Sequence, residues 1–442
     1  MKYTFRAIPL VPSGLGEEGS PNNKSEGLKS LHGIRSIIMN QEMMTARERV
    51  IRAINHEPID RMPIDLGSHM STGISMFAYW NLRKYLGLST DRIWIPDMVQ
   101  CLAYVDIDIL ERFHCDCILL EPSFPQTAQW NARGKYTFTI PTQANPQPTA
   151  DGGWLISKGD QSMRMLADDY FFNGDWLSDW GSGTEDERVA LYAREAERIY
   201  KETAYATNLV GYSHGLGLSN YGAGSIDDAM FAYDDPAGLH ERREKSLTKS
   251  IERMGKIIDS FGQYIQLVTM GDDMGTQNGP MCSPRYIEEF CIPYYKRFCK
   301  FVHANSDIKV FLHNCGSVKS LIPMLIDAGI DVLNPVQISA QNMDPQELKS
   351  EFGNKLCFWG GGCNTQLVLG AGRPEDVASN VRDLVRTFKK NSGFVFNQVH
   401  NIMGNVPPEN IVAMLDTAYE ESFYEAKQNR TDLSNKADAC GA

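Results

Sequence analysis

A histidine and two cysteines follow two short apolar runs in the second half of the chain. The run 310–312 (VFL) leads into His313 and Cys315, and the run 358–362 (FWGGG) leads into Cys363. Imidazole and thiolate are the protein ligands that zinc prefers. We therefore predict that His313, Cys315 and Cys363 bind one zinc ion and leave a fourth position open, as catalytic rather than structural zinc sites do.

Two alternatives compete with this interpretation. A His-x-Cys spacing also fits a structural histidine beside a buried thiol, and most of the ten cysteines are expected to be buried in this way. We favour the metal site because the residues follow apolar runs, glycines lie beside them, and Cys363 offers a third ligand. The competing cluster Cys115-Asp116-Cys117 lies on a predicted strand, so we expect it to pack in the core.

Further reactive side chains follow other apolar runs. Asp272 and Asp273 come after the run 264–269, and His400 comes after 394–397. We predict catalytic roles for Asp272, Asp273 and His400. The carboxylates could bind a polar or cationic group of the substrate or orient a metal ligand, and His400 could be a fourth ligand or a proton donor. An ordinary acidic turn and a loop histidine are the alternatives.

The elements that must position these residues alternate between short apolar runs and longer amphipathic stretches. The eight predicted strands are 62–66, 115–120, 208–212, 264–269, 309–312, 332–334, 356–359 and 394–397, and the later helices are 284–304, 318–328, 344–352, 374–391 and 407–421. This alternation predicts an α/β fold, a (β/α)8 TIM-type barrel. An open doubly wound sheet is the alternative, but its spaced-glycine fingerprint is absent. In the barrel, the candidate residues would gather at the carboxyl ends of the strands.

The barrel is predicted to span residues 44–425. A capping box that begins at Thr45 opens it. Residues 1–43 are predicted to be a partly mobile N-terminal extension, and 426–442 a polar tail. The segment from about 122 to 180 is rich in aromatic residues and alternating polar pieces, which indicates an antiparallel insertion on a barrel loop.

The composition limits the class of protein. The 442 residues are 42% hydrophobic and 22% charged, with a net charge of -12. This balance argues against binding to nucleic acid or to an anionic membrane surface. No apolar run reaches roughly 18 residues, and no secretory signal is recognised, so we expect no membrane partner and a cytoplasmic protein with reduced thiols.

The sequence resembles the uroporphyrinogen decarboxylase superfamily and, within it, the corrinoid-dependent methyltransferases. The resemblance runs from about Thr45 to Tyr424 and is carried by 61–67 (RMPIDLG), 271–280 (GDDMGTQNGP), 313–316 (HNCG), 360–366 (GGGCNTQ), 400–402 (HNI) and 407–410 (PPEN). It implies a TIM-type barrel, with the zinc ligands of the methyltransferase branch falling on His313, Cys315 and Cys363.

Two differences from the sequence patterns of the superfamily limit which reaction and which cofactor-binding domain we expect. Its porphyrinogen decarboxylases carry an arginine-containing motif after the first strand, whereas this chain has Ser68-His69-Met70 there. We therefore do not expect decarboxylation of a porphyrinogen. A corrinoid-binding domain would show Asp-x-His-x-x-Gly, but Tyr212 replaces the aspartate before His214. The corrinoid is thus expected on a separate partner protein.

The resemblance implies methyl transfer between a small methylated compound and the cobalt of that corrinoid protein. Zinc could activate the heteroatom of a methyl donor, or it could present a thiolate to methyl-cobalt. The insertion aromatics Trp130, Trp154, Phe171 and Phe172 suggest a flat, methoxylated aromatic donor, unless they form a small core of their own. The alternatives are a methylcorrinoid:thiol methyltransferase of the coenzyme M type, a zinc-independent decarboxylase and a non-catalytic binding protein. We also allow for a homodimer.

Overall fold

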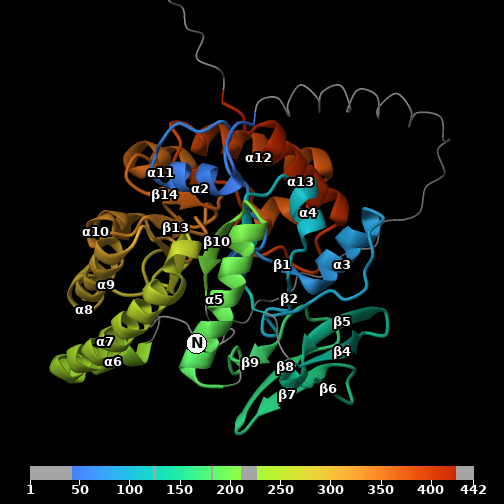
Figure 1. Cartoon of the computed structure of the whole chain (residues 1–442), viewed down its shortest axis with the longest axis horizontal. Helices are drawn as coiled ribbons and strands as arrows, with labels where there is room; N and C mark the ends of the chain where they lie inside the picture. Colours follow the sequence, from blue (N-terminus) through green and yellow to red (C-terminus); the bar gives the residue numbers. More distant parts are fainter. Residues whose placement is uncertain (1–41, 123–125, 181–182, 211–225, 425–442) are drawn as a thin grey trace, which may run out of the picture.

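The structure is a computed structural model that describes residues 42–122, 126–180, 183–210 and 226–424 (Figure 1). Nearly all of the predicted N-terminal extension, the polar tail and the segment around His214 lie outside these residues. Seven strands form one parallel sheet in the order β15-β14-β13-β12-β11-β10-β3. Their bounds are β3 Cys117–Leu119, β10 Ala206–Leu209, β11 Leu267–Gly271, β12 Lys309–His313, β13 Val332–Asn334, β14 Cys357–Trp359 and β15 Phe394–Val395.

The sheet closes into a barrel through residues 63–65, which lie between β3 and β15. Ile64 pairs in parallel with Phe396, and the Phe396 N–H donates to the Pro63 carbonyl (2.8 Å). On the other side, the Asp116 N–H donates to the Ile64 carbonyl (2.7 Å). The predicted TIM-type barrel is confirmed, with its first strand reduced to a short bridging segment.

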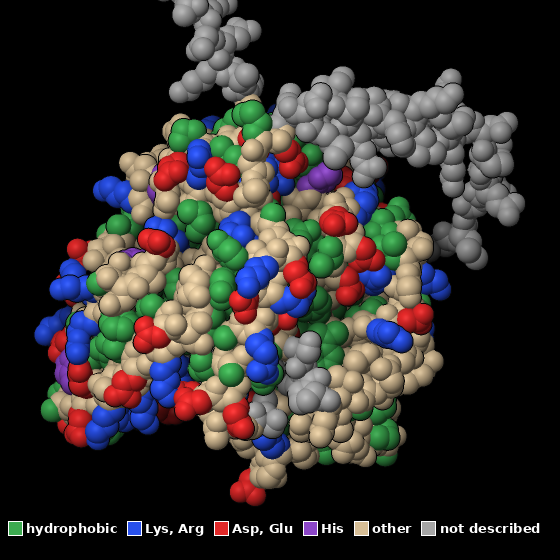
Figure 2. Space-filling model, in the orientation of Figure 1, with side chains coloured by type: hydrophobic (Ala, Val, Ile, Leu, Met, Phe, Trp, Pro, Cys, Tyr) green, Lys and Arg blue, Asp and Glu red, His purple; other side chains and the backbone are tan. Residues whose placement is uncertain are grey.

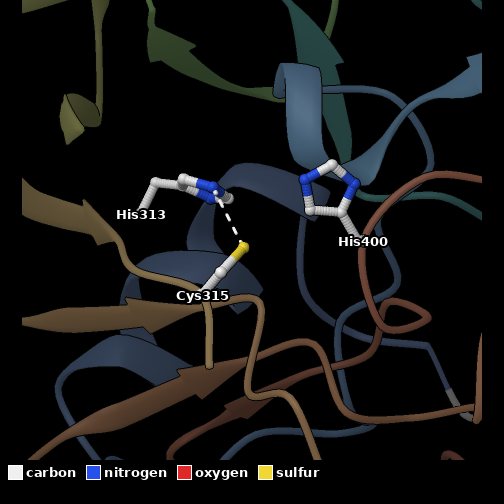
Figure 3. Close-up of side chains that lie close together, drawn as sticks. All are labelled: His313, Cys315 and His400. Carbon is white, nitrogen blue, oxygen red and sulfur yellow. Dashed lines mark hydrogen bonds between the residues drawn. The ribbon is translucent and has the colours of Figure 1, made fainter. Parts of the chain in front are cut away.

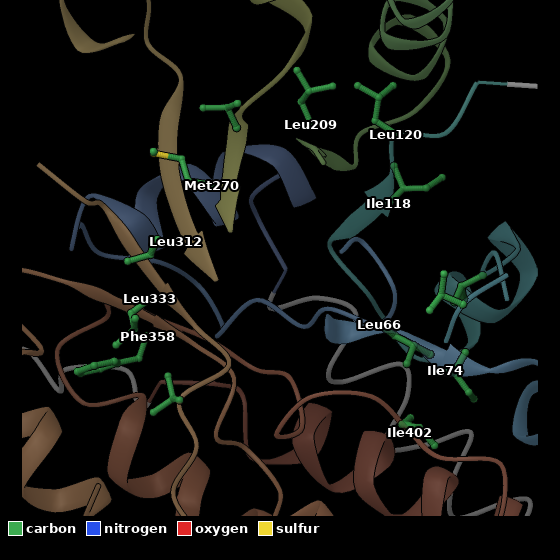
Figure 4. Close-up of a cluster of buried hydrophobic side chains, with 14 of the residues drawn as sticks. Leu66, Ile74, Ile118, Leu120, Leu209, Met270, Leu312, Leu333, Phe358 and Ile402 are labelled. Carbon is green, nitrogen blue, oxygen red and sulfur yellow. The ribbon is translucent and has the colours of Figure 1, made fainter. Parts of the chain in front are cut away.

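Side chains of the strands alternate between two cores, because successive residues of a strand point to opposite faces. The outer face packs against the surrounding helices, and Figure 4 shows part of this layer: Ile118, Leu209, Met270, Leu312, Leu333 and Phe358. The inner face fills the barrel with Cys117, Ala206, Leu267, Phe311, Val332, Cys357 and Val395. The barrel interior is therefore packed, and any site must lie at one of its ends.

Helix α2 (Ala46–Ile54) packs against β3, β10 and β15 and closes one end of the barrel. The hydroxyl of Thr45 accepts a hydrogen bond from the Glu48 N–H (3.2 Å), which confirms the predicted cap. Val50 and Ile54 are buried in the inner core. Burial of two such aliphatic side chains stabilises the fold by about 1.5–3 kcal/mol each.

A buried ion network holds α2 to the wall of the barrel. The Asp116 carboxylate is fully buried and accepts hydrogen bonds from Arg61 Nη1 (2.7 Å), from the Ile64 N–H (2.8 Å) and from Arg49 Nη1. Arg49 Nε also donates to Asp60 (2.7 Å). Arg49 of the helix and Arg61, just before the bridging segment, thus share the acid that immediately precedes β3.

The predicted antiparallel insertion is present between β3 and α5 (Glu185–Glu202). Its strands are β4 Thr127–Ala132, β5 Tyr136–Pro141, β6 Gln147–Pro148, β7 Trp154–Lys158, β8 Gln161–Met165 and β9 Asn173–Gly174. Trp130 and Phe172 are buried, and the ring of Trp130 meets that of Trp154 edge to face (5.4 Å between centroids). Trp130, Trp154 and Phe172 thus pack together and join the main hydrophobic cluster, so they serve packing, as one of the two interpretations expected.

The remaining helices are α3 Met76–Tyr85, α4 Ile107–Arg112, α6 Ile226–Asp234, α7 Pro236–Phe261, α8 Pro284–Phe290, α9 Ile292–Asn305, α10 Ile322–Ala328, α11 Pro345–Phe352, α12 Pro374–Phe388 and α13 Pro408–Glu420. A two-stranded ribbon joins β1 Ile74–Ser75 to β2 Leu102–Ala103. The prediction of one helix over 284–304 is wrong, because the helix breaks at Cys291. Pro293 has no N–H to continue the helical ladder and starts the new helix instead.

The strand predicted at 208–212 begins and ends earlier than expected, at Ala206 and Leu209. The strand predicted at 264–269 is shifted the other way, because Gly262–Tyr264 forms a 3-10 turn before β11. On the face shown in Figure 2, acidic and basic side chains are interspersed with neutral ones. Within the described ranges, no helix combines the length and the apolar character needed to cross a membrane.

Candidate metal centre

The inner face of the sheet changes from apolar to polar at the carboxyl ends of the strands. In β10, β12 and β13, the residue two positions after an inner-core side chain is polar: these residues are Asn208, His313 and Asn334. Because side chains two apart on a strand share a face, these polar groups lie above the packed interior. The end of the barrel opposite α2 is therefore where a site can form.

The imidazole of His313 is oriented by a chain of hydrogen bonds. Its Nδ1 lies 3.0 Å from the Oδ1 of Asn334, and the Nδ2 of Asn334 donates to the Trp359 carbonyl (2.9 Å), which fixes the amide orientation. The hydroxyl of Ser71 donates to the same Oδ1. An amide oxygen can only accept, so we assign the His313 proton to Nδ1. The lone pair of Nε2 is then free to bind a metal.

We predict that Asn334→Ala lowers metal affinity by about 10- to 100-fold, the usual effect of removing the partner that orients a ligating histidine. Asn334→Asp should retain affinity better, because a carboxylate also accepts the Nδ1 proton. Competition with a zinc chelator measures both variants. Equal zinc affinity in Asn334→Ala and the parent protein would mean that this hydrogen bond does not orient His313 for metal binding.

Cys315 lies next to the free nitrogen of His313. Its Sγ is 3.5 Å from His313 Nε2, and its backbone N–H donates to Asp273 Oδ1 (2.9 Å). The same Oδ1 is 3.7 Å from His313 Nε2. Burial and the nearby Asp273 hold the pKa of the Cys315 thiol well above its usual range. A divalent cation would reverse this by binding the thiolate.

Asp273→Asn is predicted to retain zinc but to lower kcat/KM by about 10- to 100-fold, the loss expected when a hydrogen bond to a charged group is removed. Asparagine keeps an Oδ1 that accepts from the Cys315 N–H, so the loop should keep its shape. Zinc content and steady-state kinetics distinguish a role of Asp273 in turnover from a role in metal binding or loop structure. Unchanged kinetics would assign Asp273 to the architecture of the loop.

The ligand atoms of His313, Cys315 and His400 all lie within 4.8 Å of one another (Figure 3). The imidazole rings of His313 and His400 meet edge to face, with 5.7 Å between their centroids. Burial and the nearby His313 lower the pKa of His400 to about 4. His400 is therefore neutral near pH 7 and has a lone pair available for a metal.

Cys363 is fully buried on the loop after β14, beside the loop that carries His400. The Val399 N–H donates to the Cys363 carbonyl (3.0 Å), so the two loops run together. Gly360 permits the turn that leads to Cys363: its φ is +110°, and a Cβ there would lie 2.2 Å from the Pro335 carbonyl oxygen. Cys363 is not a member of the 4.8 Å group, and it remains a predicted ligand.

The two adjacent aspartates have different surroundings. Asp273 faces His313 and Cys315, whereas the carboxyl of Asp272 is buried and accepts a hydrogen bond from the Tyr295 hydroxyl of α9. Burial raises the pKa of Asp272 to about 7. The structure thus brings Asp273 and His400 close to His313 and Cys315, and it directs Asp272 to a helix outside the strands.

Sequence reasoning did not identify His69, Ser71 or Asn334 as site residues. The ring of His69 stacks on that of His313 (5.6 Å between centroids), and its Nδ1 accepts from the Ser71 N–H (3.0 Å). The sequence did contain a signal for two of them, because Asn334 ends the predicted strand 332–334 and His69 follows the first predicted strand, 62–66. The rule that selected His313 would have selected both.

Comparison with known proteins supports the fold. Residues 227–421 match the family model described as uroporphyrinogen decarboxylase (URO-D). A uroporphyrinogen decarboxylase of Chlorobium phaeobacteroides is 28% identical over 140 residues, which is 30% of this chain and 37% of the relative. One of Vesicomyosocius okutanii is 26% identical over 193 residues, which is 42% of this chain and 50% of the relative. The chain therefore spans half or less of the length of these relatives.

A solved structure extends the likeness over more of the chain. A methyltransferase from Methanosarcina mazei superimposes with a TM-score of 0.52 and covers 85% of this chain and 99% of its own. At 12% sequence identity this likeness shows a shared fold. The proteins that resemble this chain are thus named as enzymes of two different chemistries, decarboxylation and methyl transfer.

Proposed function

We propose that this protein is a zinc-dependent methyltransferase that moves a methyl group between a small methylated compound and the cobalt of a separate corrinoid protein. The observation that carries the proposal is the group of nitrogen and sulfur donors formed by His313, Cys315 and His400 at the mouth of the barrel. Such donors suit zinc rather than magnesium or calcium. Cys363, on the neighbouring loop, is the proposed third ligand beside His313 and Cys315.

Zinc bound here would act as a Lewis acid on the heteroatom of a methyl donor or would hold a substrate thiol as its thiolate. Neighbouring side chains of the protein orient the proposed ligands. Asn334 holds the Nε2 of His313 toward the mouth, and Asp273 holds the loop of Cys315. We favour demethylation of a methoxylated aromatic compound. Methylation of a thiol of the coenzyme M type remains the alternative within this class.

A decarboxylase on the same barrel is the second candidate, because the curated relatives carry that name. A porphyrinogen carries several carboxylates, which arginines would bind. After the first strand this chain has Ser68 and His69, both buried. This segment offers no guanidinium to a polyanionic substrate, which disfavours the decarboxylase.

The test has two parts. Zinc content per chain is measured after purification, and methylation of free cob(I)alamin is then followed across methoxylated aromatics, methylamines and methyl thiols. The proposal expects about one zinc and transfer from one donor class, with loss of transfer after chelation and recovery with added zinc. Release of carbon dioxide from a carboxylated substrate by chelated protein would instead favour the decarboxylase.

A further inference from the structure

We propose that His400 is itself a metal ligand and occupies, in the resting protein, the position that a substrate must enter. This inference rests on the zinc site of the proposed function. A nitrogen of the His400 ring lies within 4.8 Å of both the His313 nitrogen and the Cys315 sulfur. Figure 3 shows the His400 ring across the mouth from these two side chains, with a nitrogen toward them. Small side-chain movements would bring all three atoms to bonding distance from one ion.

The backbone holds His400 in an unusual conformation. Its φ is +61°, in the left-handed region that residues other than glycine seldom adopt. The Nε2 of Gln398 donates to the His400 carbonyl (2.8 Å), and on the other side Asn401 donates to Gln100 (2.9 Å) and accepts from the Gly73 N–H (3.0 Å). His56 and His114 have a similar φ elsewhere in the chain, so the φ of His400 shows only that these hydrogen bonds fix the direction of its side chain.

The ring of His400 has no other polar partner among the described residues. Two histidines elsewhere do have polar partners: His240 Nδ1 lies 2.7 Å from the Tyr294 hydroxyl, and His303 Nε2 lies 2.8 Å from Asp331. The buried Nε2 of His69, beside His313, has none among the described residues. A half-buried imidazole without a hydrogen bond is costly unless a ligand or water binds it. A metal bound by His313 and Cys315 would satisfy one nitrogen of His400.

With Cys363 as the further ligand of the proposed function, these residues would make a set of four donors, two imidazoles and two thiolates. Four protein ligands would fill the tetrahedral sphere of zinc, so we infer that a substrate enters by displacing one donor. His400 is the best candidate to withdraw. Its described polar contacts are made by the backbone, whereas His313 is held through its ring by Asn334, and loss of Cys315 or Cys363 would separate a thiolate from the cation.

The test replaces His400 by asparagine, because asparagine also adopts the left-handed region and should preserve the loop. Zinc X-ray absorption of the full chain counts imidazole and sulfur neighbours, and the visible spectrum of the Co²⁺-substituted protein reports the coordination number. We expect two imidazoles in the parent and one in His400→Asn. Zinc affinity should fall by at least about 10-fold, the lower end of the loss caused even by outer-shell changes.

His303→Asn on α9 is the matched control and should leave the spectra and the zinc affinity unchanged, with circular dichroism and Tm confirming that both variants fold. One imidazole in the parent protein, or identical metal spectra in parent and His400→Asn, would overturn the inference while leaving the zinc site of the proposed function intact. A parent protein that binds no zinc or cobalt would overturn both. Metal binding with two imidazoles but no methyl transfer would retain the inference and reject the proposed activity.

Discussion

Replacing Cys363 by alanine is expected to remove the bound zinc and the methyl transfer together. Its thiol is fully buried, and burial raises its pKa to about 12 in the absence of a cation. A buried thiolate is stable only beside a positive charge, so zinc and thiolate stabilise each other. Alanine removes the sulfur with little change in the loop, because the hydrogen bond from Val399 is made to the backbone.

The measurement is zinc per chain after gel filtration, followed by the cob(I)alamin assay with added zinc. Cys315→Ala should behave in the same way, with activity at background. Cys299→Ala, at a buried cysteine on α9, is the matched control and should retain zinc and activity. Zinc retained by Cys363→Ala but lost by Cys315→Ala would show that the ion is held without Cys363, by His313, Cys315 and His400.

Asp116→Ala is expected to cause the largest loss of stability, lowering the free energy of unfolding by about 3–5 kcal/mol. The change leaves the guanidinium groups of Arg49 and Arg61 buried without their shared acid, and it removes the acceptor for the Ile64 N–H. Because Ile64 lies in the segment that closes the barrel, the loss should weaken both the helix and the closure. Asp60 would still pair with Arg49, and the partly exposed Glu42 with Arg61 Nε (3.0 Å), but neither replaces the acceptor for the Ile64 N–H.

Urea unfolding followed by circular dichroism measures this change as a shift of the midpoint at constant slope. Lys245→Ala is the control, because its pair with Glu241 on α7 is 71% and 68% exposed and should contribute less than about 1 kcal/mol. A loss below about 1 kcal/mol in Asp116→Ala would mean that water or the neighbouring acids replace the missing carboxylate.

Most of the candidate site could be predicted because the barrel rule turns a position along the sequence into a position in space. Residues that follow strands lie at one end of the barrel, whatever their separation along the chain. This rule predicts that His313, Cys315, Cys363, Asp273 and His400 gather at one end, and the structure brings all but Cys363 close together there. The same rule could not separate Asp272 from Asp273, since consecutive residues after a strand point in different directions.

The sequence by itself determined the alternation of strands and helices, the insertion and the set of metal-binding residue types. These depend on local periodicity and on side-chain chemistry, which each segment carries alone. The tertiary structure decided which donors approach one another, that Asn334 and Ser71 orient His313, and that the aromatics of the insertion pack together. Each of these depends on contacts between segments distant along the chain, whose distances and directions are fixed only when the barrel closes through residues 63–65.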